Sequence, residues 1–273
     1  MIKRTFLTLS GFSLAVMDNG NHGPAIIFLH GNSLNSETYF HQFDDKTLSG
    51  YRIVAIDFPG HGASPAAIDP SAMYNLFYFR DLIASIIEQL NLHSYIVVGH
   101  SLGGHVAMEL LQTVNRCKGL FLTGAPPARL PLDTSQLFQA DERVGLLFKP
   151  ALSSIEAQSL ASLLTCDKHQ QQVSNWLMAT DPAFRENFPV SLGAGLVSDE
   201  FILLRDAEIP FALVHGENDA LINAAYLDGI RLNNLWQGKV ITVKDACHLP
   251  QVENPLAFNA LLDNFVQSFL NQS

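Results

Sequence analysis

The sequence lacks the features that mark disulfide-rich, membrane and secreted proteins. Its 273 residues include only three cysteines, Cys117, Cys166 and Cys247, an odd number at wide spacings. This arrangement predicts neither a disulfide framework nor a C-x-x-C site, so we expect reduced, mostly buried thiols. The longest apolar stretches, such as residues 95–99 and 119–123, are far shorter than the ~20 residues of a membrane-spanning helix. Because no signal peptide is recognisable either, the sequence predicts a cytoplasmic protein with no membrane partner.

Positive charge and metal-binding patterns are also scarce. The chain has 16 Lys and Arg against 26 Asp and Glu, a formal net charge of -10 at pH 7. Nucleic acids and anionic lipids attract clustered Lys and Arg, so neither is expected as a partner. His61 and His100 lie in separate segments and no two histidines have i, i+4 spacing, so we predict no metal and no cofactor. A small molecule is the expected partner of a monomer or homodimer.

What the sequence does contain is an alternation of strand-like apolar runs and helix-periodic segments, which is typical of a mostly parallel α/β sheet. The predicted strands are residues 25–29, 52–56, 95–98, 120–122, 210–215 and 239–243, and the predicted helices are residues 76–90, 102–114 and 255–270. Between residues 125 and 209 the strand signals disappear, and short helical segments break at Pro131, Pro150, Pro182 and Pro189. We predict an α/β core of residues 1–125 and 207–273, with residues 126–206 inserted as a helical cap.

The strongest local signal is a G-x-S-x-G match formed by Gly99, Ser101 and Gly103, which lies between a predicted strand and a predicted helix. A serine on such a sharp turn is exposed for nucleophilic attack, and the helix N-terminus directs the backbone N–H of Leu102 at the substrate oxygen. The simpler interpretation is a serine that only caps a helix. The strand-turn-helix setting favours Ser101 as a nucleophile and Leu102 as an oxyanion donor.

A serine nucleophile needs a base and an orienting carboxylate, which follow it in the order acid, then histidine, in this kind of fold. Asp219 and His248 each come shortly after a predicted strand, so both should reach the carboxyl edge of the sheet. Glu217, two residues before Asp219, is the rival carboxylate, and Cys247 is expected to be a small packing residue. Asn32, in the loop after residues 25–29, is the predicted second oxyanion donor.

These motifs together resemble the α/β-hydrolase superfamily, and the resemblance spans nearly the whole chain. It is carried by residues 29–32, 57–62, 99–104, 215–219 and 247–248. More narrowly, the chain is similar to the acyl-homoserine lactonases of this fold through residues 30–33, 122–127, 165–166 and 234–239. The resemblance implies a serine triad without metal that opens the lactone ring of an N-acyl-homoserine lactone beneath the cap.

Within that comparison, His100 stands where the lactonase pattern has a tryptophan, and Leu160 where a cap tyrosine is expected. We predict that His100, Phe138, Leu160 and Trp176 contact the substrate. The same triad also suits a general carboxylesterase, a C–C bond hydrolase or a cofactor-free perhydrolase, and a non-catalytic small-molecule receptor can share the fold.

Other polar residues have simpler interpretations. Asp57 and His61 lie in a segment rich in glycine and proline, so we interpret them as parts of a tight turn. Isolated histidines, His105 among them, are expected to be surface groups or satisfied by local hydrogen bonds.

Overall fold

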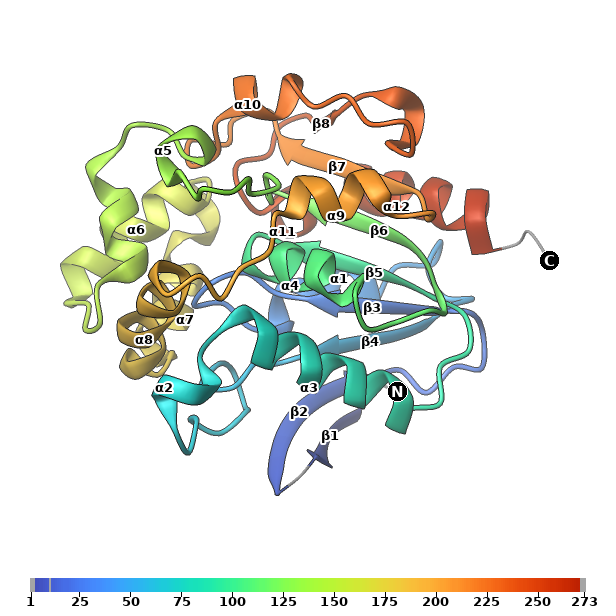
Figure 1. The fold of residues 1–273 in the computed structure, drawn as a ribbon, viewed down its shortest axis with the longest axis horizontal. Coiled ribbons are helices and arrows are strands. Elements are labelled where there is room, and N and C mark those ends of the chain that lie inside the picture. Colours follow the sequence, from blue (N-terminus) through green and yellow to red (C-terminus); the bar gives the residue numbers. More distant parts are fainter. Residues whose placement is uncertain (1–2, 10, 271–273) are drawn as a thin grey trace.

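The fold is built on one twisted sheet. The computed structural model describes residues 3–9 and 11–270, and these contain an eight-stranded sheet with the strand order β1-β2-β4-β3-β5-β6-β7-β8 (Figure 1). The strands are β1 Lys3–Leu9, β2 Phe12–Asp18, β3 Ala25–Leu29, β4 Arg52–Ile56, β5 Tyr95–His100, β6 Cys117–Thr123, β7 Phe211–Gly216 and β8 Ile241–Val243. All strand pairs from β4 to β8 are parallel, whereas β1 pairs with β2, and β2 with β4, in antiparallel fashion. The predicted α/β class with a mostly parallel sheet is confirmed, and β1 and β2 extend it.

Helices cover both faces of this sheet. The α-helices are α1 Phe40–Phe43, α2 Pro70–Met73, α3 Leu76–Gln89, α4 Leu102–Leu110, α5 Thr134–Leu137, α6 Ser154–Leu164, α7 Gln170–Ala179, α8 Pro182–Gly193, α9 Glu200–Asp206, α10 Ala224–Asp228, α11 Pro250–Glu253 and α12 Pro255–Leu270. Short 3-10 helices are η1 Ser36–Tyr39, η2 Glu142–Phe148, η3 Asp167–His169 and η4 Trp236–Gly238. Two apolar clusters follow the two faces: one holds Phe79 of α3 and Val106 of α4, the other Phe258 and Phe265 of α12.

Local sequence explains where these elements begin and end. Every residue of β3 and of β5 is buried, as expected for central parallel strands covered by helices on both faces. Helix α3 begins after Asn75, whose side chain accepts a hydrogen bond from the N–H of Tyr78. Helix α4 ends at Leu110 instead of extending to residue 114. None of the described helices is long and apolar enough to cross a membrane.

The segment between β6 and β7, residues 124–210, is helical; we call it the helical insertion. Its helices α5 to α8 gather beyond one end of the sheet, at the left of Figure 1. Pro182 begins α8 as expected, but Pro189 lies inside α8, so the prediction that it breaks a helix is wrong. Helix α9, within the range predicted as cap, packs against α4 over the sheet instead.

This topology determines where functional side chains can meet. Each strand from β3 through β5, β6 and β7 to β8 pairs in parallel with the next strand in the sheet. The carboxyl ends of these strands therefore lie at one edge of the sheet. Ligands of open α/β sheets bind outside this edge. The loops that follow these strands, with the helical insertion beside them, therefore form the place to look for a site.

Candidate active site

Ser101 lies on a strained turn between β5 and α4. Its backbone has φ 50° and ψ −118°, a conformation that residues with a side chain rarely adopt. The turn is held by a 2.8 Å hydrogen bond from the Ser101 N–H to the carbonyl of Thr123. A Cβ atom at Gly99 would collide with the carbonyl of Gly103, and one at Gly103 with the carbonyl of Leu29. The two glycines thus permit the close strand-helix approach that presents Ser101.

Asp219 and His248 are brought together from two different loops. His248 Nδ1 lies 2.8 Å from Asp219 Oδ2, and the two side chains are only 2% and 1% exposed. Because a carboxylate accepts, Nδ1 carries the hydrogen and Nε2 keeps the lone pair that a general base needs. The geometry therefore fits a base oriented by an acid, as the sequence predicts.

The charge state of Asp219 follows from its surroundings. Burial alone raises the pKa of the Asp219 carboxyl, but the charge of His248 and its hydrogen bond lower it. The N–H groups of Leu221 and Ile222, at 2.9 and 3.1 Å from Oδ1, lower the pKa further. The net shift is below the ordinary value, so Asp219 is ionised at neutral pH.

Glu217, the rival carboxylate, is placed differently. It is exposed, and its Oε2 accepts a 3.3 Å hydrogen bond from the N–H of Asp245. Only Asp219 of these two acids contacts His248.

One cavity collects most of the predicted site residues. The space between its walls, including the open mouth, is about 780 Å³. Six of the predicted residues line it: Asn32, His100, Ser101, Leu102, Phe138 and His248. Most of the remaining wall is apolar, with leucines from the core and from the helical insertion, so the cavity suits a hydrocarbon chain beside the serine.

The two residues predicted as oxyanion donors, Asn32 and Leu102, both line the cavity. Leu102 is the first residue of α4, where backbone N–H groups have no intrahelical partner. The loop of Asn32 is fixed from both sides: the Ser33 N–H donates to His61 Nε2 at 3.2 Å, and Arg185 Nη1 donates to Ser33 Oγ at 2.9 Å. Neither His61 nor Arg185 lines the cavity, so both support the loop. Asp57 likewise accepts backbone N–H groups, and its interpretation as a turn residue agrees with this geometry.

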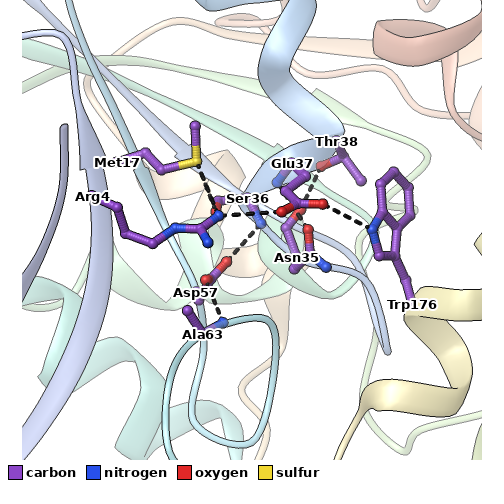
Figure 2. Close-up of polar contacts among 9 residues, drawn as sticks. All are labelled: Arg4, Met17, Asn35, Ser36, Glu37, Thr38, Asp57, Ala63 and Trp176. Atoms are coloured by element: carbon purple, nitrogen blue, oxygen red, sulfur yellow. Dashed lines mark hydrogen bonds and ion pairs between the residues drawn. The ribbon is translucent and has the colours of Figure 1, made fainter. Parts of the chain in front are cut away.

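Leu160 and Trp176 are not among the residues that line the cavity, contrary to their expected contact with substrate. Leu160 is fully buried on α6 in the apolar cluster of the helical insertion. Figure 2 shows why Trp176 is elsewhere: its indole N–H points to Glu37, with Nε1 3.3 Å from Oε2, and Glu37 also pairs with Arg4. Trp176 therefore joins α7 to the loop region after β3 instead of contacting the cavity.

His100, the residue before Ser101, is a neutral part of the cavity wall. Its Nε2 donates to the carbonyl of His248 at 2.8 Å, which fixes the tautomer because a carbonyl only accepts. Burial, with the charge of His248, lowers the pKa of His100 to about 3. His100 thus adds shape and polarity to the cavity without charge, and it supports the backbone of the loop that carries His248.

The expectation of three reduced thiols is wrong for two of the cysteines. Cys166, just after α6, and Cys247, next to His248, form a disulfide, while Cys117 is free and buried. Their separation of 81 residues gives no hint that the fold brings them together. Cys247 therefore cross-links the helical insertion to the loop that carries His248. Disulfides are typical of oxidising compartments, so this bond does not support the predicted cytoplasmic location, which stays a prediction.

Glu253 reinforces the same junction. Its two oxygens accept 2.6 Å hydrogen bonds from the Thr165 hydroxyl and from the N–H groups of Cys166 and Cys247. A metal site needs several His, Cys, Asp or Glu side chains close together. In the part of the chain that the structure describes, one group of three such residues has its ligand atoms within 4.8 Å of one another: Cys166, Cys247 and Glu253. Both sulfurs are bonded to each other and the carboxylate is occupied, so this donor set does not suit a metal ion.

We expect the disulfide to stabilise the fold. Replacing both Cys166 and Cys247 with serine should lower the free energy of unfolding by about 3 kcal/mol, since the cross-link restricts the unfolded chain. Urea unfolding measures this, with Cys117→Ser as the control for loss of a thiol alone. Thiol titration of the denatured, unreduced protein should detect Cys117 and neither partner of the disulfide. Titration of all three cysteines would contradict the cross-link.

Two ionisable residues of the cavity wall, His105 and Glu200, were not singled out as site residues in the sequence. His105, grouped there with the isolated histidines, lines the cavity and contacts Glu200, which also lines it. The available signal was the spacing of four residues from Ser101, which puts His105 on the same side of α4 as the nucleophile.

Comparison with known proteins agrees with this geometry. Over 260 residues the chain is 27% identical to a pimeloyl-[acyl-carrier protein] methyl ester esterase of Nitrosomonas europaea, covering 92% of this chain and 98% of that protein. It is 26% identical over 262 residues to the 2-hydroxy-6-oxononadienedioate/2-hydroxy-6-oxononatrienedioate hydrolase of Escherichia coli K12, covering 91% and 89%.

Among solved structures, a mutant of the N-acyl homoserine lactonase AidH complexed with N-hexanoyl homoserine lactone has a TM-score of 0.92 at 26% identity, covering 97% of this chain and 98% of that chain. The same lactonase complexed with N-butanoyl homoserine has a TM-score of 0.93, covering 100% and 98%. The predicted resemblance to lactonases of this fold is confirmed. The model of the family described as "alpha/beta hydrolase fold" matches residues 24–255, and the chain therefore belongs to this family.

Proposed function

We propose that the protein is a serine hydrolase that cleaves a carboxylic ester or lactone through an acyl-enzyme, with Ser101, His248 and Asp219 as its triad. The observation that carries the proposal is the 2.8 Å contact between Asp219 and His248 beside a cavity that Ser101 also lines. The strained backbone of Ser101 at the start of α4 supports it.

In the proposed reaction, Ser101 Oγ attacks the carbonyl carbon while His248 Nε2 takes the hydroxyl proton. The N–H groups of Asn32 and Leu102 hold the negative oxygen of the tetrahedral intermediate. The leaving oxygen departs with the proton from His248, and Ser101 remains acylated. Water then attacks the acyl carbon and gives one proton to His248, which passes it to Ser101 Oγ as the acyl–oxygen bond breaks and the carboxylic acid is released. Asp219 keeps the imidazole oriented throughout.

N-acyl-homoserine lactones are the proposed substrate class. The similarity to the lactonase extends along the whole chain, and the apolar cavity wall suits an acyl chain. In this arrangement the helical insertion, within the proposed range of residues 126–206, acts as a cap that supplies Phe138 to the wall.

A general carboxylesterase is the closest alternative, because the esterase relative acts on an open ester by its name. A C–C bond hydrolase has less support. The relative of that kind acts on a dicarboxylate by its name, whereas no Lys or Arg is among the described residues that line this cavity. A carboxylate would therefore lack a Lys or Arg partner there, and the charge of His105 is already balanced by Glu200.

Turnover of a substrate panel tests the proposal. The purified protein should open N-hexanoyl homoserine lactone, followed by proton release, and should hydrolyse p-nitrophenyl esters of graded chain length more slowly. Ester cleavage without ring opening would establish a carboxylesterase instead. No turnover of either class, with no labelling of Ser101 by a fluorophosphonate, would favour a receptor and contradict the proposed mechanism.

A further inference from the structure

His105 and Glu200 form a polar pair in the wall of the otherwise mostly apolar cavity. His105 lies on α4, one helical turn beyond Ser101, and its Nδ1 is 2.9 Å from both carboxylate oxygens of Glu200. Glu200, at the start of α9, is fully buried, and its Oε2 also accepts the N–H of Ala128 at 2.7 Å. The pair therefore has a fixed position relative to the nucleophile.

The surroundings of His105 favour its charged form. Burial lowers the pKa of His105, but the charge and hydrogen bonds of Glu200, with a smaller effect of Glu109, outweigh it and leave the pKa above its ordinary value. Glu200 comes from α9 and Glu109 from α4 itself, where Arg80 of α3 faces Glu109. An imidazolium held by one carboxylate has a second N–H to donate.

That second N–H is available to a ligand. Nδ1 is engaged by Glu200, whereas Nε2 has no hydrogen-bond partner among the described residues. Nε2 is also not among the fully buried polar atoms that lack a hydrogen-bond partner, and 20% of the His105 side chain is exposed while the residue lines the cavity. His105 therefore adds a ring nitrogen without a described protein partner to the wall of a mostly apolar cavity.

We propose that His105 is a specificity-determining residue whose Nε2–H donates a hydrogen bond to an oxygen on the chain of the substrate. The preferred substrates then carry a keto, ether or hydroxyl oxygen in addition to the carbonyl that Ser101 attacks. Cβ atoms four residues apart on a helix are ~5–6 Å apart, so this oxygen lies a few bonds from the scissile carbonyl. The inference rests on the proposed serine hydrolase and adds its substrate selectivity.

Isosteric esters test the inference. We would compare p-nitrophenyl hexanoate with p-nitrophenyl 3-ethoxypropanoate and 4-methoxybutanoate, in which an ether oxygen replaces one methylene group. For each protein we would take the ratio of kcat/KM for an ether ester to kcat/KM for hexanoate. For one of the two ethers this ratio should be about five- to tenfold higher in the wild type than in His105→Leu, because only the wild type forms the additional hydrogen bond. Thr134→Val, which removes a hydroxyl from the same cavity wall, should keep the wild-type ratio.

A pH series tests the donor directly. Below the raised pKa of His105 both ring nitrogens donate; above it Glu200 retains the hydrogen on Nδ1, and Nε2 becomes an acceptor. The ether preference of the wild type should therefore decline as pH rises through that pKa. Any pH effect on the bond-breaking step that both esters share cancels in this ratio. His105→Gln keeps an amide donor at this position, so it should retain part of the preference without the pH dependence.

The outcomes separate the inference from the proposed function. If the wild type cleaves none of the esters or lactones, the proposed function fails and the inference with it. If it cleaves them but His105→Leu and wild type have equal ratios, the serine hydrolase stands and the inference is overturned. Equal ratios in His105→Gln and wild type at every pH would overturn it as well, since the protonated imidazole would then have no part in selection.

Discussion

Alanine in place of Ser101 should lower kcat for esters and lactones by at least about 10⁴-fold, because no other group of the proposed triad can form the acyl-enzyme. The fold should survive, since alanine has the same φ preference as serine at this strained turn and the 2.8 Å bond from the backbone N–H to Thr123 remains. Steady-state kinetics with p-nitrophenyl hexanoate, and of lactone ring opening, measure the effect.

A matched control is Ser154→Ala, an exposed serine at the first position of α6, which should keep wild-type kcat. Mass spectrometry after fluorophosphonate treatment adds a second readout: one adduct on the wild type and on Ser154→Ala, none on Ser101→Ala. A Ser101→Ala protein that folds and still turns over near the wild-type rate would remove Ser101 from the mechanism.

Asparagine in place of Asp219 should lower kcat by about 10⁴-fold at neutral pH. Its oxygen can still accept the N–H groups of Leu221 and Ile222. Its amide NH₂ then faces His248 Nδ1 and forces the hydrogen onto Nε2, where it blocks proton transfer from Ser101. The loss should therefore lie in kcat, with thermal unfolding little changed.

Glu217→Gln is the matched control, because Glu217 lies in the same loop but contacts the Asp245 N–H instead of His248. We expect it to keep kcat within about twofold, as is usual for an exposed substitution. A large loss in Glu217→Gln together with a small one in Asp219→Asn would assign the acid role to Glu217 and refute the geometric assignment.

Local patterns made the sheet edge and its polar loops predictable. Ser101, Asp219 and His248 each follow an apolar run that could be recognised as a strand, and parallel strands necessarily end at one edge. Strands β1 and β2 were not recognised from the sequence. In β1 the exposed residues follow no clean alternation, so periodicity gave no signal there.

Contacts of the helical insertion were much harder to anticipate. Helical spacing shows which residues share an apolar face, but it does not show which partner covers that face. Leu160 is predicted to contact substrate because it stands where the lactonase pattern has a cap tyrosine, and Trp176 because it is an apolar residue of the cap. Helices α6 and α7 instead direct them to the interior of the insertion and to Glu37. The Cys166–Cys247 bond and the His105–Glu200 pair likewise depend on tertiary approaches that no local rule encodes.

The disulfide also gives the chain a closed covalent ring. Cys166 and Cys247 are 81 residues apart, and the ring includes helices α7 to α9, strand β7 and the loop that carries Asp219. A single peptide-bond cut inside this ring opens it without releasing a fragment. Asp219 therefore stays covalently joined to His248 by two routes, one through β8 and the other through the helical insertion.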